Sequence, residues 1–353
     1  MARRILIDAL AARYGGTATA TVQLARHLAT SDNVSTVAVV TRHGSIVERG
    51  LAGEEAIKCV ALPAAPGVEL IERIRWEAFR LPALVREEEY DVVISMSGML
   101  PRSPGCRLMC LIGNPVMYES PAPANLLRQW AVRRTAREAE YLAAPSRAMA
   151  DLISASVKRP CAALPWGVDH NIFSPADSPG EEILCVADFK AYKRHDLVIE
   201  AWLRLATPRP PLSFVGNPDV EPQAHTRLLT QISTLPEADS IRLEYRVPHE
   251  RMPDIYRRAR VFVMPSEHES FCMPLAESMA CGVPAVVRGI RSLRETGGAG
   301  AMYLETDDPA EWAAAVRRLI EDNREHARAR ELAIRAAARF TWEAFAADLA
   351  ARL

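Results

Sequence analysis

Two glutamates, separated by seven residues, stand out among the side chains that could do chemistry. Glu269 lies in a polar loop and Glu277 in the helical segment that follows it. An apolar run at 261–264 predicts a buried strand before the loop, so the three segments form a strand-loop-helix unit. Such a helix points free backbone N–H groups at the carboxyl edge of the strand, where an anion can bind. Hydroxyl-binding carboxylates beside an anion site indicate a ligand with both sugar and phosphate.

The helix of this unit carries signals at both ends. Pro274 is expected to open it and Gly282 to close it, because proline favours the first helical position and glycine the position after the last turn. A second apolar run at 285–287 predicts another buried strand directly behind the helix. The helix and its two flanking strands therefore predict a ligand site at the edge of a sheet.

Lysine is rare in this chain, because only four of the 43 basic residues are Lys58, Lys158, Lys190 and Lys193. A lysine that remains is expected where a compact ammonium group works and a planar guanidinium does not. Two of the four are three residues apart, and Lys193 lies near a predicted helix start, where it could neutralise a diphosphate. Chance clustering of solvated lysines is the alternative.

Glycines follow two of the predicted strands. Gly15 and Gly16 come after the first strand, and Gly216 ends a strand in the second half. Glycine lets a backbone approach a ligand closely and can present N–H groups to phosphate. A plain turn is the alternative at both places.

Short apolar strands alternate with helical patterns along the whole chain, which predicts the α/β class with parallel sheets and right-handed crossovers. Strands are expected near 4–8, 35–41, 57–62, 91–96, 107–112, 141–144, 161–164, 182–187, 212–216, 241–245, 261–264, 284–288 and 302–304. Helices are expected near 17–29, 68–87, 123–139, 147–155, 193–206, 221–233, 250–259, 274–281, 308–321, 323–338 and 341–353.

The 353 residues exceed one ordinary core and fit two doubly wound domains. A stretch rich in Pro, Gly, Asp and Ser at 166–180 predicts the hinge, with one domain over 1–166 and the other over 167–339. Ligands of such folds bind at the carboxyl ends of the strands, so function is expected in the loops after strands, at a cleft between the domains.

Composition excludes several classes of protein. A net charge of −1 argues against general nucleic-acid binding, and no apolar run approaches the roughly 20 residues that span a bilayer. The apolar start is short and contains Asp8, which favours a buried strand over a signal peptide. The seven cysteines show no metal-ligand spacing, which predicts reduced cysteines in a cytoplasmic protein.

A run of arginines follows Leu126 and Leu127 in one predicted helix. Its members are Arg128, Arg133, Arg134 and Arg137. Such a face could contact anionic lipid or could simply be solvated. At most, the sequence predicts peripheral contact with a membrane.

In this order, the motifs resemble those of one family: the retaining glycosyltransferases of family 4 (glycosyl transferases group 1), which have the GT-B fold of two Rossmann-like domains facing across a cleft. The resemblance covers almost the whole chain and is densest over 161–287. The matching residues are Gly15-Gly16, Trp166-Gly-Val-Asp169, Phe173, Pro175, Tyr192-Lys-Arg-His-Asp196, Gly216, Met252-Pro-Asp-Ile-Tyr256, Pro265-Ser266, Glu269 to Glu277, and Ala280-Cys-Gly-Val-Pro284.

The resemblance implies a role for each matching residue. Glu277 would bind the ribose hydroxyls of a nucleotide-sugar donor, Glu269 would sit near the donor sugar, and Lys193 would neutralise the diphosphate. Gly15, Gly16 and Gly216 would line the cleft, and the helix at 340–353 would pack back on the first, acceptor-side domain. The diphosphate itself would be held by the loop and helix start made of Ser270, Phe271, Cys272, Met273, Pro274 and Leu275.

The chain departs from the family pattern at three places. Asp188 stands where an arginine is usual, so Lys190 or Arg194 is expected to take over donor binding while Asp188 turns away. Asn114 stands near the position of the usual acceptor-side histidine and could offer hydrogen bonds but no strong base. Cys272 stands where glycine is common, and a minor effect on the loop is expected.

These observations predict a cytoplasmic bacterial enzyme that moves a hexosyl-type group from a UDP-, GDP- or dTDP-sugar to an acceptor hydroxyl. The acceptor would be a small molecule, a saccharide or a lipid-linked saccharide. The chain contains no Asp-x-Asp pair, which predicts a metal-independent reaction, and the resemblance implies front-face attack with retention. An epimerase-like enzyme and a catalytically silent nucleotide-sugar-binding partner are the alternatives.

Overall fold

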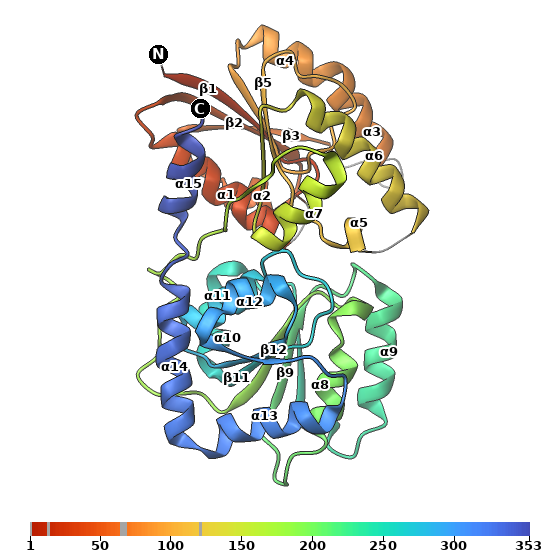
Figure 1. Cartoon of the computed structure of the whole chain (residues 1–353), viewed down its shortest axis with the longest axis vertical. Coiled ribbons are helices and arrows are strands. Elements are labelled where there is room, and N and C mark those ends of the chain that lie inside the picture. Colours follow the sequence, from red (N-terminus) through yellow and green to blue (C-terminus); the bar gives the residue numbers. More distant parts are fainter. Residues whose placement is uncertain (1, 13–14, 64–68, 120–121) are drawn as a thin grey trace. The chain divides into compact units, whose positions relative to one another are not determined.

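The computed structural model describes residues 2–12, 15–63, 69–119 and 122–353. The chain forms two compact units, shown in Figure 1. Unit 1 consists of Met1–Gly167 and Thr341–Leu353, and unit 2 consists of Val168–Phe340. Each unit contains one parallel sheet with helices packed against it, so the predicted α/β class with two Rossmann-like, doubly wound domains is confirmed.

The sheet of unit 1 has seven strands in the order β3-β2-β1-β4-β5-β6-β7. They are β1 (Arg3–Asp8), β2 (Val34–Arg42), β3 (Ile57–Leu62), β4 (Val92–Ser95), β5 (Arg107–Leu111), β6 (Tyr141–Ala144) and β7 (Ala162–Ala163). The helices of this unit are α1 (Gly15–Ala29), α2 (Ile46–Gly50), α3 (Glu69–Arg75), α4 (Leu81–Glu87), α5 (Val116–Glu119), α6 (Pro123–Glu138), α7 (Arg147–Val157) and α15 (Trp342–Ala350).

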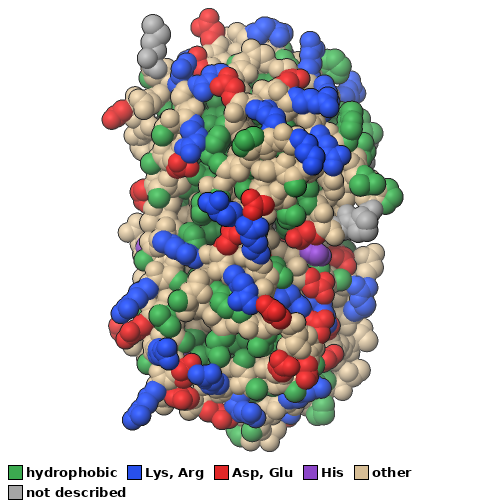
Figure 2. Space-filling view, viewed as in Figure 1, with side chains coloured by type: hydrophobic (Ala, Val, Ile, Leu, Met, Phe, Trp, Pro, Cys, Tyr) green, Lys and Arg blue, Asp and Glu red, His purple; other side chains and the backbone are tan. Residues whose placement is uncertain are grey.

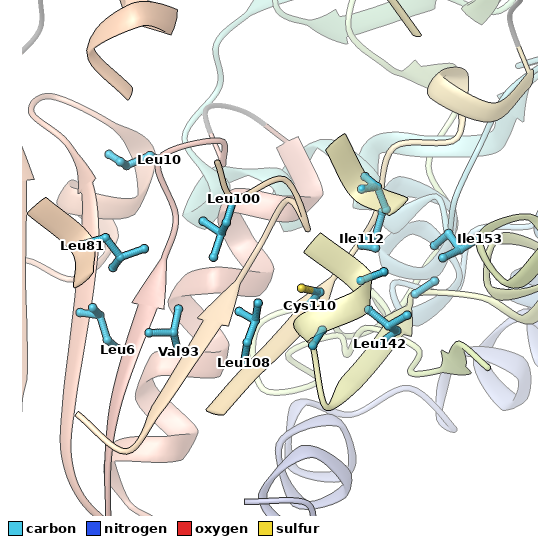
Figure 3. Close-up of a cluster of buried hydrophobic side chains, with 14 of the residues drawn as sticks. Leu6, Leu10, Leu81, Val93, Leu100, Leu108, Cys110, Ile112, Leu142 and Ile153 are labelled. Atoms are coloured by element: carbon cyan, nitrogen blue, oxygen red, sulfur yellow. The ribbon is translucent and has the colours of Figure 1, made fainter. Parts of the chain in front are cut away.

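Alternate residues of the central strands build the core on one face of this sheet, as Figure 3 shows. Leu6 of β1 pairs in register with Val93 of β4, which pairs with Leu108 of β5. Because side chains alternate along a strand, all three point to the same face. The helices α4, α6 and α7 cover that face with Leu81, Val132 and Ile153, among others. Two-sided burial explains why these strands are apolar runs in the sequence.

The final helix belongs to unit 1. Thr341 caps it by accepting a hydrogen bond from the N–H group of Ala344 at 3.1 Å. The helix packs against α1, where Nε2 of His27 lies 3.6 Å from a carboxylate oxygen of Glu343.

The sheet of unit 2 has six strands in the order β10-β9-β8-β11-β12-β13. They are β8 (Glu182–Val186), β9 (Leu212–Gly216), β10 (Ile241–Tyr245), β11 (Ala259–Met264), β12 (Ala285–Arg288) and β13 (Ala301–Leu304). The helices are α8 (His195–Trp202), α9 (Pro222–Ser233), α10 (Met252–Arg258), α11 (Met273–Ala280), α12 (Arg291–Gly297), α13 (Pro309–Glu321) and α14 (Asn323–Ala337). The helices α8, α9 and α13 pack on one face of the sheet with Trp202, Ile232 and Trp312.

The structure corrects several boundaries. The helix after Glu269 begins at Met273, with Pro274 at its second position. The helix expected over 193–206 is a 3₁₀ turn at Ala191–Lys193 followed by α8, because Arg194 adopts a left-handed backbone with φ of 54° between them. The segment expected to be one helix over 68–87 contains a π-helical turn at Trp76–Arg80 between α3 and α4. The short helices α2, α5 and α12 were not predicted.

Two other sequence expectations concern composition. The seven cysteines have free thiols; Cys110, Cys185, Cys272 and Cys281 are buried, whereas Cys59 is exposed. In the described part of the chain, every helix is too short or too polar to cross a bilayer.

Candidate functional site

The carboxyl edge of the unit 2 sheet brings together two loops that carry predicted site residues. One loop follows β8 and contains Lys193, and the other follows β11 and contains Glu269. Because β8 and β11 are neighbouring parallel strands, both loops leave the sheet at the same edge. There Nζ of Lys193 lies 2.6 Å from Oε1 of Glu269, and only 13% and 10% of the two side chains are exposed. The two predicted catalytic residues therefore form a largely buried ion pair.

The charge state of this pair follows from two opposing effects. Burial disfavours the ammonium form of Lys193, but the charge of Glu269, with help from Tyr192, outweighs burial and raises the pKa of the lysine. Lys193 is therefore a permanent cation at neutral pH. An anionic ligand that enters the site would share the positive charge of Lys193 with the carboxylate of Glu269.

The two loops are tied to each other around this pair. The N–H group of Glu267 donates to the carbonyl oxygen of Tyr192 at 2.9 Å. The guanidinium of Arg194 reaches Glu267 at 3.1 Å and Asp307 at 3.2 Å, and it also pairs with Asp196. Arg194, which was predicted as a possible donor-binding residue, is thus engaged by three carboxylates. Its contacts fix the loop that carries Lys193.

The start of α11 lies in the same loop as Glu269. Cys272 precedes the helix with a left-handed backbone, φ 69° and ψ 73°. Its carbonyl oxygen accepts the N–H group of Leu275 at 3.1 Å. Pro274 carries no N–H group, and the N–H group of Leu275 already donates within the loop. The backbone donors that could bind an anion therefore belong to the residues before Pro274. Glycine adopts this left-handed conformation without steric cost, whereas Cys272 carries a Cβ atom.

Glu277 is buried in the middle of α11, with 6% of its surface exposed, and both of its oxygens have partners. Oε1 lies 2.9 Å from Nε2 of His249, and Oε2 accepts the hydroxyl of Tyr256 at 2.8 Å. Burial lowers the pKa of His249, but the hydrogen bond and charge of Glu277 outweigh it and raise that pKa. Phe173, from the predicted hinge, packs on the rings of His249 and Tyr256, with centroids 5.1 Å and 6.0 Å away.

His249 and Tyr256 orient the carboxylate of Glu277 without using all of its hydrogen-bond acceptor positions. An ionised carboxyl group offers about four lone-pair positions, and the two donors occupy one on each oxygen. Glu277 therefore retains the capacity to accept two further hydrogen bonds, as a pair of neighbouring hydroxyl groups would supply. Neither His249 nor the tie between it and Glu277 was predicted from the sequence.

Two other predicted residues lie along the same edge. Nζ of Lys190 lies 4.0 Å from a carboxylate oxygen of Asp188 and 3.4 Å from the hydroxyl of Tyr192. Gly216 ends β9, and a Cβ atom there would lie 2.1 Å from the carbonyl oxygen of Ala187. Gly216 is therefore required by the close approach of two backbones, rather than by a turn.

Comparison with known proteins decides the family. The family model described as "Glycosyl transferases group 1" matches residues 171–336, and the one described as "Glycosyltransferase Family 4" matches residues 14–172. The chain belongs to glycosyltransferase family 4.

Similar sequences share one description. This glycosyltransferase is 29% identical over 308 residues to the D-inositol 3-phosphate glycosyltransferase of Thermobispora bispora, an alignment that covers 77% of this chain and 72% of that protein. It is 30% identical over 231 residues to D-inositol 3-phosphate glycosyltransferase 1 of Catenulispora acidiphila, which covers 60% of this chain and 53% of that protein.

Solved structures of low sequence identity share the fold. Anabaena Alr3699/HepE in complex with UDP-glucose superimposes with a TM-score of 0.83 at 15% identity, over 99% of both chains. Sucrose-phosphate synthase from Thermosynechococcus elongatus superimposes with a TM-score of 0.81 at 18% identity, over 98% of this chain and 97% of that one. These matches establish the GT-B fold of the glycosyltransferase.

The remaining predicted site residues of the glycosyltransferase lie in unit 1. Gly15 and Gly16 begin α1, and Asn114 is exposed in the loop after β5. A Cβ atom on the neighbouring Gly113 would lie 3.8 Å from the hydroxyl oxygen of Thr17. The start of α1 and the loop with Asn114 are therefore close together at the carboxyl edge of this sheet.

The sequence did not predict a buried cluster at the same edge of unit 1. Asp8 ends β1 and accepts the N–H group of Leu10 at 3.3 Å, while Nε of Arg73 donates to Glu77 at 2.5 Å and its other end to Ser97 at 3.1 Å. Burial raises the pKa of Asp8. Burial and then the charge of Asp8 raise the pKa of Glu77 to about 8. Only Asp8, at the end of an apolar strand, gave a signal in the sequence.

Within the described ranges, no group of three or more His, Cys, Asp or Glu side chains is placed to hold a metal ion.

Proposed function

We propose that this glycosyltransferase moves a hexosyl-type group from a nucleoside diphosphate sugar to an acceptor hydroxyl, with retention of configuration at the anomeric carbon. Unit 2 would bind the donor and unit 1 the acceptor. The observation that carries the proposal is the buried pair of Lys193 and Glu269 beside the start of α11. Alr3699/HepE, which has the same fold, was crystallised with UDP-glucose, which supports a nucleotide sugar as the donor.

Each part of the donor has a matching group on unit 2. Glu277 would accept the two ribose hydroxyls, since His249 and Tyr256 hold its carboxylate in place. Lys193 and the backbone at 270–273 would hold the diphosphate, and Glu269 would lie near the sugar. Lys190 would add the second positive charge, because Arg194 is already held by three carboxylates.

The part of this reaction that most needs stabilisation is the departure of the nucleoside diphosphate. The acceptor oxygen forms a bond to the anomeric carbon as the bond from that carbon to the β-phosphate oxygen breaks. Negative charge then grows on the diphosphate, where a fixed cation and backbone dipoles in a dry site stabilise it most. The leaving phosphate takes the acceptor's proton on the same face, so no separate base is required. Asn114 would orient the acceptor by hydrogen bonds.

The acceptor is proposed as a saccharide, a small polyol or a lipid-linked saccharide. The relatives' shared description makes a cyclitol phosphate the first compound to test. We also place the enzyme in the cytoplasm, where nucleotide sugars are available, and propose that it works without a metal.

A donor panel tests this function. The chain is incubated with UDP-, GDP- and dTDP-sugars, without acceptor and then with inositol phosphate, in the presence and absence of a chelator. We expect slow hydrolysis of one donor, faster transfer with an acceptor, an α-linked product from an α-linked donor, and no effect of the chelator.

The same panel separates the alternatives. Tight donor binding without turnover would favour a catalytically silent nucleotide-sugar-binding protein. The pairing of Lys190 with Asp188 and the exposed Asn114 are the features that support this alternative. Recovery of an epimerised sugar nucleotide would favour an epimerase. A Glu277→Ala variant that retains full donor affinity would contradict the whole assignment of the site.

A further inference from the structure

Large hydrophobic side chains are exposed in two helical segments of unit 1. Those on α3, the π-helical turn and α6 are each 45% to 66% exposed: Leu70, Ile71, Ile74, Phe79, Leu126, Leu127 and Trp130. Single exposed apolar residues are normal on a soluble protein, but a group of this size marks a binding surface. We call this group the apolar surface of unit 1.

The spacing of these residues shows that each helix presents them on one side. Leu70, Ile71 and Ile74 follow the pattern i, i+1, i+4, and Leu126, Leu127 and Trp130 repeat it. Residues with this spacing lie on the same face of a helix. On α6 the opposite face, with Val132 and Ala136, packs into the core. On α3 no residue is buried at all, so its apolar side chains contribute little to folding.

The two helices flank one loop, the segment after β4. Arg73 of α3 donates to the hydroxyl of Ser97 at 3.1 Å. Arg134 of α6 donates to the carbonyl oxygen of Pro101, and Thr135 of α6 donates to that of Leu100 at 3.1 Å. Both helices are therefore anchored to the same short segment. Figure 2 shows hydrophobic side chains at the edge of unit 1 where Figure 1 places α3 and α6, with basic side chains beside them.

The charges on α6 are almost all positive. From Pro123 to Glu138 the helix carries four arginines, and Glu138 at its end is its one acid. Arg133 and Arg137 are exposed and lie one and two turns beyond the apolar residues, on the same side of the helix as Trp130. An apolar first half with a tryptophan and a cationic second half match the acyl region and the headgroups of an anionic bilayer.

We propose that the apolar surface of unit 1, together with Arg133 and Arg137, docks on an anionic lipid bilayer. A second copy of the chain fits less well, because a two-fold contact would place this arginine-rich face against an identical one. Docking would bring the acceptor-side unit to lipid-linked acceptors. This consequence rests on the proposed function, but lipid binding itself does not.

Vesicle co-sedimentation tests the surface directly. The chain is mixed with vesicles of phosphatidylcholine alone and with vesicles that also contain phosphatidylglycerol. We expect it to sediment with the anionic vesicles only, and less in high salt, because salt screens surface charge. Replacing the apolar residues of α6 with L126S, L127S and W130S should reduce the bound fraction at least about 10-fold. L70S with I71S should cause a smaller loss.

Two controls make the result specific. Leu229 is an exposed leucine on α9 of unit 2, so L229S should bind vesicles like the unchanged chain. Arg133→Gln with Arg137→Gln should remove the preference for anionic vesicles. All variants should keep their thermal unfolding and their donor hydrolysis in solution, so failure of lipid docking and failure of the proposed function are distinguishable.

Two outcomes would overturn the proposal. One is a chain that does not sediment with either kind of vesicle, or an α6 variant that sediments as well as the unchanged chain. The other is a concentration-dependent dimer that the α6 substitutions abolish, because that result would assign the surface to a second copy.

Discussion

The carboxyl edges of the two sheets both carry a pair of carboxylates, but the two pairs are in different electrostatic situations. In unit 2, Glu269 has a lysine at 2.6 Å, and Glu277 has two hydrogen-bond donors. In unit 1, Asp8 and Glu77 are both buried, and the charge of Arg73 acts on both of them. Each carboxylate of unit 2 therefore has its own side-chain partners, whereas those of unit 1 both interact with Arg73 and repel each other.

This difference separates a binding site from a structural cluster. Burial raises the pKa of both Asp8 and Glu77, and the charge of Asp8 raises the pKa of Glu77 further, so this pair favours holding a proton. Such a cluster offers an incoming ligand little net charge. In unit 2, Lys193 pairs with Glu269, and Glu277 keeps lone pairs that a hydroxyl group can use. A place near the end of a strand thus identifies candidate binding residues. The charges around each residue then decide which of them can bind a ligand.

The largest effect is expected from Lys193→Met, which keeps most of the length of the side chain and removes its charge. The diphosphate would lose its nearest fixed cation, and Glu269 would become an unpaired buried carboxylate that repels it. The rate of sugar transfer should fall by about 10²–10³-fold, the usual loss when one transition-state stabilising group is removed. Steady-state kinetics with the donor identified by the panel measure this.

A matched control shows that the effect belongs to the site. Lys58 also pairs with a glutamate, at 2.8 Å, but on the exposed surface of unit 1. Lys58→Met should leave the rate unchanged and alter the free energy of unfolding by less than about 1 kcal/mol. A rate for Lys193→Met close to that of the control would show that the buried pair is structural, like the unit 1 cluster.

A smaller loss is expected from Glu277→Gln. The amide keeps one oxygen for Tyr256 or His249 but presents an NH₂ group to the other donor, so the side chain can no longer accept from both. Donor affinity should fall at least about 10-fold, or ~1.4 kcal/mol, in a calorimetric titration.

His249 gives this variant a readout independent of activity. Because the hydrogen bond and charge of Glu277 raise the pKa of His249, that pKa should fall in Glu277→Gln, as followed by NMR. Glu331→Gln, on the exposed side of α14, serves as the control. An unchanged pKa of His249 would mean that Glu277 does not hold it.

Most of the fold was predictable because buried parallel strands are unmistakable in sequence. The central strands of both sheets are apolar runs, whereas the edge strand β10 alternates apolar residues with Arg242 and Glu244. The short helices α2 and α5 were not predicted, because a single turn of helix has almost no periodicity in its sequence. The helix predicted from 193 begins only at His195, because the left-handed backbone of Arg194 separates a 3₁₀ turn from α8, and no local pattern in the sequence indicates that conformation.

The site was predictable in part for a similar reason. Lys193 and Glu269 follow neighbouring strands, so parallel topology alone brings them to one edge. The tie between Glu277 and His249, and the cluster of Asp8 with Glu77, depend on side chains that meet only after folding. A local pattern cannot reveal partners of that kind.

The unit 1 cluster has its own signature in the pH dependence of stability. The pKa of Glu77 is about 8 in the folded chain and near 4.5 when unfolded. Between these values the folded chain binds more protons than the unfolded chain, so the free energy of unfolding should fall as pH rises. From pH ~6 to pH ~7.5 the decrease should approach ~2 kcal/mol, at about 1.4 kcal/mol per pH unit.

Glu77→Gln tests this directly. The amide mimics the protonated acid, so the variant should unfold with nearly the same free energy at both pH values. Urea denaturation at each pH measures the difference. If the variant keeps the slope of the unchanged chain, Glu77 is ionised in the fold, and the contrast between the two edges disappears.

The smallest effect concerns the backbone rather than charge. Cys272 is buried with φ of 69°, a conformation that costs a residue with a Cβ atom roughly 1–2 kcal/mol and costs glycine nothing. Glycine loses part of this gain because its unfolded chain is more flexible, by about 0.4–1 kcal/mol. Cys272→Gly should therefore be more stable than Cys272→Ala by about 1 kcal/mol or less, since both variants lose the buried thiol and only alanine keeps the strain. Urea denaturation of the pair measures it. Equal stabilities would show that the loop relaxes freely around position 272.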